Sequence, residues 1–165
     1  MKFFNLILIS LFLVFFISLA QAEIKLDEFT LAESCSSNSC KLLWKGKEIG
    51  SLQIIGPEKP ILLKIENKTF SPDESVYMLH YDAGIAGTLI QNQIERVLLF
   101  TENKGEISVG NDHIFKILRF QGEKTLLDET RKIKINNKEI NFEAFDEEDP
   151  AHYKLIQGKL ISLNQ

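Results

Sequence analysis

The sequence predicts an all-β fold, an antiparallel β-sandwich or a partly open barrel with at most one or two short helices. Short apolar runs recur along the chain, and turn-forming residues separate them. Apolar and polar residues alternate within several of these runs, which is typical of strands that bury one face. No repeat, low-complexity tract or flexible linker divides the chain, so we expect one domain after its N-terminal segment.

Residues 1–22 are predicted to be a cleavable signal peptide, which leaves 23–165 as a single exported domain. Lys2 precedes an almost wholly apolar stretch over 3–20, and Ala20-Gln21-Ala22 has the small-x-small pattern of a signal-peptidase site. The apolar stretch is also just long enough for an uncleaved membrane anchor, which is the alternative. Cleavage predicts a secreted or periplasmic protein.

Composition limits the classes of partner. The formal net charge is −4, and it becomes −5 once Lys2 is removed. An acidic chain with scattered basic residues is a poor match for nucleic acid or for an anionic membrane, so neither is expected to bind the mature domain.

The two cysteines, Cys35 and Cys40, are predicted to form a disulfide. They are separated by the polar run 36–39, and an exported protein meets an oxidising environment. Free or redox-active thiols and a metal site are the alternatives. A redox motif would need Cys-x-x-Cys, however, and a structural zinc site would need four ligands.

Two strand segments are expected early in the domain. Residues 41–55 predict a hairpin that turns at 45–48, with a bulge near Gly50. In 61–66 the alternation predicts that Ile61, Leu63 and Ile65 share one buried face.

The middle of the chain mixes helix and strand signals. Ser71-Pro72-Asp73-Glu74 resembles a capping box and predicts one helical turn. Residues 76–81 have the composition of a strand. Over 88–98 the apolar spacing suits either a helix or a strand, with strand favoured.

Three further strand pairs are expected toward the C-terminus. Residues 96–109 form a hairpin around 102–105, and 132–145 form another around 136–138, where Asn137 tolerates a positive φ. Residues 153–163 close the fold, broken at 157–158.

The stretch from His80 to Thr88 is the first candidate for function. His80 and Asp82 are a titratable pair on one strand face, and the glycines after them would let a ligand approach the backbone. The predicted ligand-binding residues are therefore His80, Asp82, Gly84, Gly87 and Thr88, in a loop at a sheet edge. The same glycines also suit a purely structural turn, which is the simpler interpretation.

Two charged segments and the single tryptophan are given structural interpretations. We expect the acidic run 146–149 to be a solvated loop, and the basic run 131–134 to be solvated as well. Trp44 is predicted to pack in the core.

No catalytic or metal-binding motif is present. The histidines have none of the spacings of zinc enzymes, and no nucleophile elbow or phosphate loop occurs, so no metal or cofactor is expected. The leading hypothesis is a non-enzymatic binding or envelope-associated domain whose ligand is a protein, a glycan or a small molecule. The alternatives are a small exported hydrolase that uses His80 and Asp82, and a purely structural envelope component.

Overall fold

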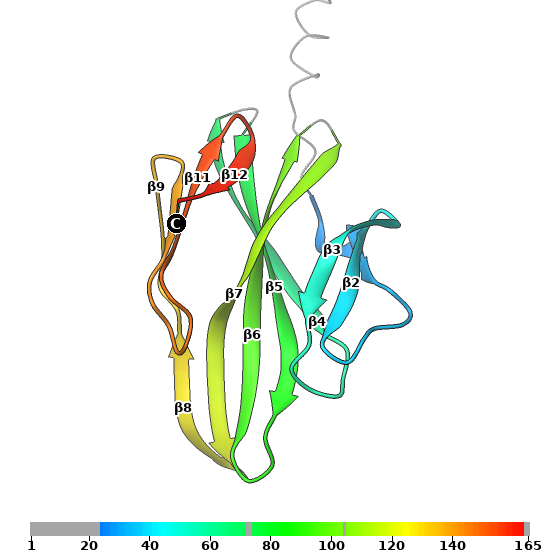
Figure 1. The fold of residues 1–165 in the computed structure, drawn as a ribbon, viewed down its shortest axis with the longest axis vertical. Coiled ribbons are helices and arrows are strands. Elements are labelled where there is room, and N and C mark those ends of the chain that lie inside the picture. The colour runs from blue at the N-terminus through cyan, green and yellow to red at the C-terminus, as the bar shows by residue number, and fades with distance from the viewer. Residues whose placement is uncertain (1–23, 72–73, 104, 164–165) are drawn as a thin grey trace, which may run out of the picture.

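The computed structural model describes residues 24–71, 74–103 and 105–163 and is drawn in Figure 1. In this part of the chain a single 3₁₀ turn, η1 (Leu26–Glu28), precedes strands that form three antiparallel sheets, which confirms the all-β prediction. The strands are β1 (Phe29–Leu31), β2 (Ser39–Trp44), β3 (Lys47–Gln53), β4 (Ile61–Ser71), β5 (Glu74–Ala86), β6 (Gln91–Asn103), β7 (Glu106–Gln121), β8 (Lys124–Thr130), β9 (Ile133–Asn136), β10 (Glu139–Phe142), β11 (Ala151–Ile156) and β12 (Lys159–Ser162).

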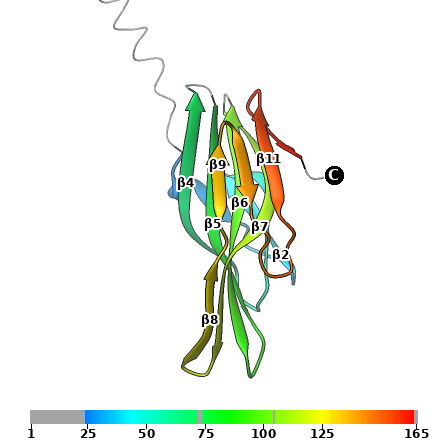
Figure 2. The same cartoon turned by 90° about the vertical axis from the view of Figure 1, so that its left-hand side faces the viewer.

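A long central sheet, in the order β4-β5-β6-β7-β8, carries a smaller sheet on each face. The N-terminal sheet, β1-β2-β3, packs on one face, and the C-terminal sheet, β12-β11-β10-β9, packs on the other (Figures 1 and 2). The C-terminal sheet covers only part of its face. Toward the lower end of Figure 1, β8 and the β5–β6 hairpin extend beyond it.

The alternation of side chains along β5 produces the two cores, because successive residues of a strand point to opposite faces. Tyr77, Leu79 and Tyr81 pack with the N-terminal sheet. Val76 and Met78 lie in the other core, with Ile140, Phe142 and Tyr153 of the C-terminal sheet among their companions. A strand buried on both faces needs apolar side chains in both registers, which explains the unbroken apolar character of this segment.

Most of the predicted hairpins are present. β2 and β3 turn at Lys45-Gly46, β9 and β10 at Asn137-Lys138, and β11 and β12 at Gln157-Gly158. All six of these turn residues have positive φ angles, as tight turns between twisted strands require. The 96–109 hairpin joins β6 to β7, and the ambiguous segment 88–98 is strand from Gln91 onward.

The expected bulge in the first hairpin also occurs. Leu42 pairs with Gly50 and Leu43 with Glu48, so Ile49 is the extra residue. Trp44 is buried as predicted, and its indole N–H donates a hydrogen bond to Glu28 (3.0 Å).

The predicted face of 61–66 is wrong. Ile61 and Leu63 are exposed, while Leu62 and Ile65 pack against the core of the N-terminal sheet. The reason is a register shift between Leu62 and Lys64, which leaves Leu63 as an extra residue and inverts the alternation.

Ser71 and Glu74 do not begin a helix. They end β4 and begin β5, pair across the two strands, and the Ser71 hydroxyl donates to the Glu74 carboxylate (3.2 Å). Positions 72 and 73, where the helical turn was predicted, lie outside the described residues.

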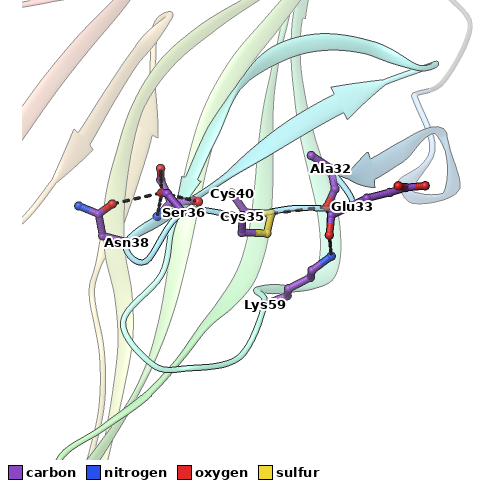
Figure 3. The surroundings of a disulfide bond; sticks show 8 residues. Ala32, Glu33, Cys35, Ser36, Asn38, Cys40 and Lys59 are labelled. Carbon is purple, nitrogen blue, oxygen red and sulfur yellow. Dashed lines mark hydrogen bonds between the residues drawn. A yellow bond between two sulfur atoms is a disulfide. The ribbon is translucent and has the colours of Figure 1, made fainter.

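The predicted disulfide between Cys35 and Cys40 is present (Figure 3). It closes the turn before β2, where the Ser36 hydroxyl bonds to the Ser39 carbonyl (2.9 Å). On the other side, Lys59 donates to the carbonyls of Ala32 and Glu33, which ties this segment to the β3–β4 connection. A disulfide-bonded, all-β structure is compatible with an extracellular location.

Most of the two charged segments is solvated as predicted, since Lys132, Lys134, Asp146, Glu147 and Asp149 are exposed, but one charged residue of each segment is not. Arg131 is buried, with 2% of its surface exposed, and Glu148 from the acidic run accepts its Nη1 hydrogen bond at 2.6 Å. Glu148 also accepts from Arg96 (3.1 Å) and from the backbone N–H of Ile114 (3.0 Å). The charge run therefore supplies an anchor between the C-terminal sheet and the central sheet.

The predicted signal peptide, 1–22, lies outside the described residues. Within the described ranges, no helix is long and apolar enough to cross a membrane.

Candidate ligand-binding site

The candidate segment is part of a strand rather than a loop. β5 continues through Asp82 to Ala86, and the turn to β6 follows at 87–90. Asp82 pairs with Glu95 and Ile85 pairs with Gln93, so two residues of β5 oppose one residue of β6. Gly84 within this bulge has a φ of +110°, a conformation that side-chain-bearing residues rarely adopt.

The two predicted glycines are held by backbone contacts. A Cβ at Gly84 would lie 3.1 Å from the N atom of Gly56, where the β3–β4 connection crosses the bulge. A Cβ at Gly87 would lie 2.1 Å from the carbonyl oxygen of Ile90. Both glycines therefore have a geometric role, and Thr88 is exposed in the turn beside them.

Asp82 lines a pocket of about 160 Å³ on the central sheet. Asp82 and His80 are on the same face of β5 as Val76 and Met78, which lie under the C-terminal sheet. They continue this face past the end of the covering sheet. The residues lining the pocket are Leu63, Asp82, Gln93, Glu95, Lys116 and Leu118. We call this uncovered part of the central sheet, with its hairpin ends, the open half.

Hydrogen bonds fix the Asp82 carboxylate. Its Oδ1 accepts from the backbone N–H of Gly84 (2.8 Å), and its Oδ2 accepts from the side-chain amide of Gln93. The bulge at Gly84 thus orients the carboxylate, and neither donor carries a charge.

His80 lies below the pocket rather than in it. Its side chain is buried, with 1% of the residue exposed, and its ring packs edge-on against Phe115. Nδ1 is 3.0 Å from the Glu95 carboxylate, while Nε2 is buried 3.9 Å from Glu66 and has no hydrogen-bond partner within the described residues. Burial lowers the pKa of His80, and the hydrogen bond to Glu95 opposes that shift. The neutral imidazole therefore donates from Nδ1 to Glu95.

His80 and Asp82 share one face of β5, and each of them is hydrogen-bonded to a residue of β6. The structure brings His80 to Glu95 on the neighbouring strand, and Asp82 to Gln93. Glu95, Gln93, Lys116 and Leu118 were not singled out from the sequence. They come from β6 and β7, and their place beside Asp82 depends on strand registers interrupted by bulges.

Exposed apolar side chains gather in the open half. Leu89, at the β5–β6 turn, has 80% of its surface exposed, and Ile90 follows it. Figure 2 shows that the β5–β6 and β7–β8 hairpins project beyond the C-terminal sheet at this end of the molecule. The exposed large apolar residues of the open half are Ile61, Leu63, Ile85, Leu89, Ile90 and Leu126.

A second, larger hollow of about 540 Å³ lies against the C-terminal sheet. The two carboxylates that line it are each paired with a lysine, Glu143 with Lys134 (2.6 Å) and Glu139 with Lys154 (3.4 Å). The two glutamates of this hollow are therefore compensated by lysines, while Phe142, Ala144 and Pro150 give it apolar surface as well.

Among the residues that the structure describes, no group of three or more His, Cys, Asp or Glu side chains could hold a metal ion. Comparisons of the chain with protein-family models, with curated proteins and with solved structures found no match.

Proposed function

We propose that this chain is an exported, non-enzymatic binding domain whose protein partner docks on the open half of the central sheet. The observation that carries the proposal is the group of exposed leucine and isoleucine side chains at the end of the sheet that neither flanking sheet covers. Apolar side chains that gather on an exposed surface mark sites of association.

The shape of the site supports binding over catalysis. The pocket beside Asp82 is small, whereas pockets for drug-sized ligands span roughly 300–1,000 Å³. The alternative, a small exported hydrolase, would need His80 to reach a substrate. Its Nε2 is buried beneath the sheet surface, and its Nδ1 is bonded to Glu95.

Export supports the same proposal. The predicted signal peptide and the Cys35–Cys40 disulfide both suit a secreted or periplasmic protein. The two flanking sheets hold the central sheet, so the open half is presented as a preformed surface, which reduces the entropy lost on binding.

The proposal is tested by substitution at the β5–β6 turn. The tagged wild-type protein, the double variant Leu89→Ser/Ile90→Ser and a control variant are used to capture partners from the native host after cross-linking. The control is Ile156→Ser/Ile161→Ser, which removes two exposed isoleucines from the C-terminal sheet. We expect the captured partner to be lost with the turn variant and retained with the control. Equal capture by both variants would contradict the proposal.

A further inference from the structure

We infer that the partner inserts an arginine side chain into the pocket, with its guanidinium group between Asp82 and Glu95. This inference rests on the proposed function, since it specifies the chemistry of the same docking surface. It follows from an excess of negative charge in a pocket beside the exposed apolar side chains of the open half.

The two carboxylates are next to each other on the sheet. Asp82 and Glu95 are direct partners in the β5–β6 pairing, so their side chains lie on one face, and both line the pocket. Like charges directly opposite each other on a sheet are destabilising unless something compensates them. A bound cation would provide that compensation.

The cations of this chain that lie nearby are directed elsewhere. Lys116 lines the pocket, but its ammonium group pairs with Asp128 at 2.9 Å. Lys64 pairs with Glu66 on β4. Within the described residues, Asp82 has no ion pair, and Glu95 is paired with His80, whose imidazole is neutral because burial lowers its pKa. The net charge around the pocket is therefore −2, from three carboxylates (Asp82, Glu95 and Asp128) and one ammonium group (Lys116).

The walls of the pocket suit an arginine side chain. Leu63 and Leu118 offer apolar surface to its aliphatic part, and Gln93 offers a side-chain carbonyl. A guanidinium group is planar, carries five donors and forms paired hydrogen bonds with carboxylates. Calcium is a poorer match, because it takes six to eight oxygen ligands and the lining side chains of Asp82, Glu95 and Gln93 supply at most five.

The test is a titration of the exported, isotope-labelled protein followed by amide NMR. The probe is a capped peptide, Thr-Leu-Arg-Leu-Thr, and the control peptide has citrulline in place of arginine. Citrulline keeps the shape of the side chain and removes its charge. We expect the arginine peptide to shift the amides of Asp82, Gln93, Glu95 and Leu118, and to bind about tenfold more tightly than the citrulline peptide.

The isosteric variants Asp82→Asn and Glu95→Gln are expected to abolish this preference while leaving the circular dichroism spectrum unchanged. Equal binding of the two peptides, or shifts elsewhere on the protein, would overturn the inference. The capture experiment distinguishes a failure of this inference from a failure of the proposed function. If Leu89→Ser/Ile90→Ser abolishes partner capture while Asp82→Asn/Glu95→Gln does not, the docking surface stands and the arginine is rejected.

Discussion

Arg131 and Glu148 form a buried ion pair, Nη1 to Oε2 at 2.6 Å, beside the edge of β7 just past the point where β8 ends. Arg131 also donates to the carbonyls of Glu143 (2.6 Å) and Asp149 (2.7 Å), and Glu148 accepts the N–H of Ile114. The pair therefore fills the place of a missing neighbouring strand. It joins the β10–β11 connection to the central sheet through charge-assisted hydrogen bonds.

Replacing Glu148 with Gln should destabilise the fold by about 3 kcal/mol, because the buried guanidinium group of Arg131 would lose the carboxylate that neutralises it, and Arg96 would keep only its ion pair with Asp112. Urea unfolding followed by Trp44 fluorescence measures this. The matched control is Glu147→Gln, since Glu147 is exposed in the same run and its substitution should change stability by less than about 0.5 kcal/mol. Equal effects of the two substitutions would contradict the assigned role of Glu148.

Glu148 should also make the fold sensitive to strong acid. Burial raises the pKa of this carboxyl, but hydrogen bonds from His113 and the Ile114 N–H, together with the charge of Arg96, lower it to about 2. Its ordinary value is 4.5, so its stabilising effect is present above pH 4.5 and is lost as the pH falls toward 2. Wild-type protein should lose roughly 2–3 kcal/mol more than Glu148→Gln over this range. Acid titrations followed by circular dichroism test this. An equal loss of stability in the two proteins would contradict the expectation.

Breaking the disulfide should have a smaller effect. Cys35 and Cys40 close a short loop, for which the chain-entropy model gives about 2 kcal/mol. Urea unfolding of the double variant Cys35→Ser/Cys40→Ser measures the loss. Because Ser36 and Lys59 hold the segment by other hydrogen bonds, we expect the native circular dichroism spectrum to persist. A variant that no longer folds would show that the bond is essential.

The sequence was sufficient for the fold class and for most hairpins, because tight turns have strong local signals. Asn137 and Gly158 occupy positive-φ turn positions where such residues are expected. The orientation of 61–66 could not be predicted, because one extra residue at Leu63 inverts the alternation and nothing in the composition marks the bulge.

The site was harder to predict, because its parts come from four strands, β4 to β7. Asp82 was recognised from its neighbours in the chain, but Glu95 becomes its partner through the pairing of β5 with β6. Arg131 and Glu148 were interpreted as solvated since charged residues usually are. Each of the two residues can be buried only because the other neutralises its charge. They are 17 positions apart, so the sequence around either residue alone does not indicate the ion pair.

Gly87→Ala should destabilise the domain more than Gly105→Ala. Both glycines have positive φ angles, +100° and +83°, so each substitution incurs about 1 kcal/mol of backbone strain. A Cβ at Gly87 would in addition collide with the Ile90 carbonyl at 2.1 Å, whereas nothing lies within 4 Å of a Cβ at Gly105. We expect a total of about 3 kcal/mol for Gly87→Ala in urea unfolding. Equal losses of unfolding free energy for the two variants would mean that the backbone of the 87–90 turn moves to accommodate the added Cβ.

His80 should make stability depend on pH near neutrality. Its ordinary pKa is 6.5, and burial lowers that pKa in the folded protein, although the Glu95 hydrogen bond opposes the shift. The unfolded chain therefore takes up the proton first as the pH falls. The stability contributed by the neutral imidazole is present above pH 6.5 and is lost as the pH falls through 6.5 toward the lower folded pKa.

Urea unfolding at a series of pH values between 8 and 5 tests this. The free energy of unfolding of the wild-type protein should fall with decreasing pH more steeply than that of His80→Gln, whose amide can still donate to Glu95 but carries no titratable group. His152→Gln, which replaces an exposed histidine on β11, is the control for the general effect of a histidine-to-glutamine substitution. The prediction would be wrong if the free energies of unfolding of the wild-type protein and of His80→Gln changed equally with pH. Such a result would mean that folding does not change the pKa of the His80 imidazole.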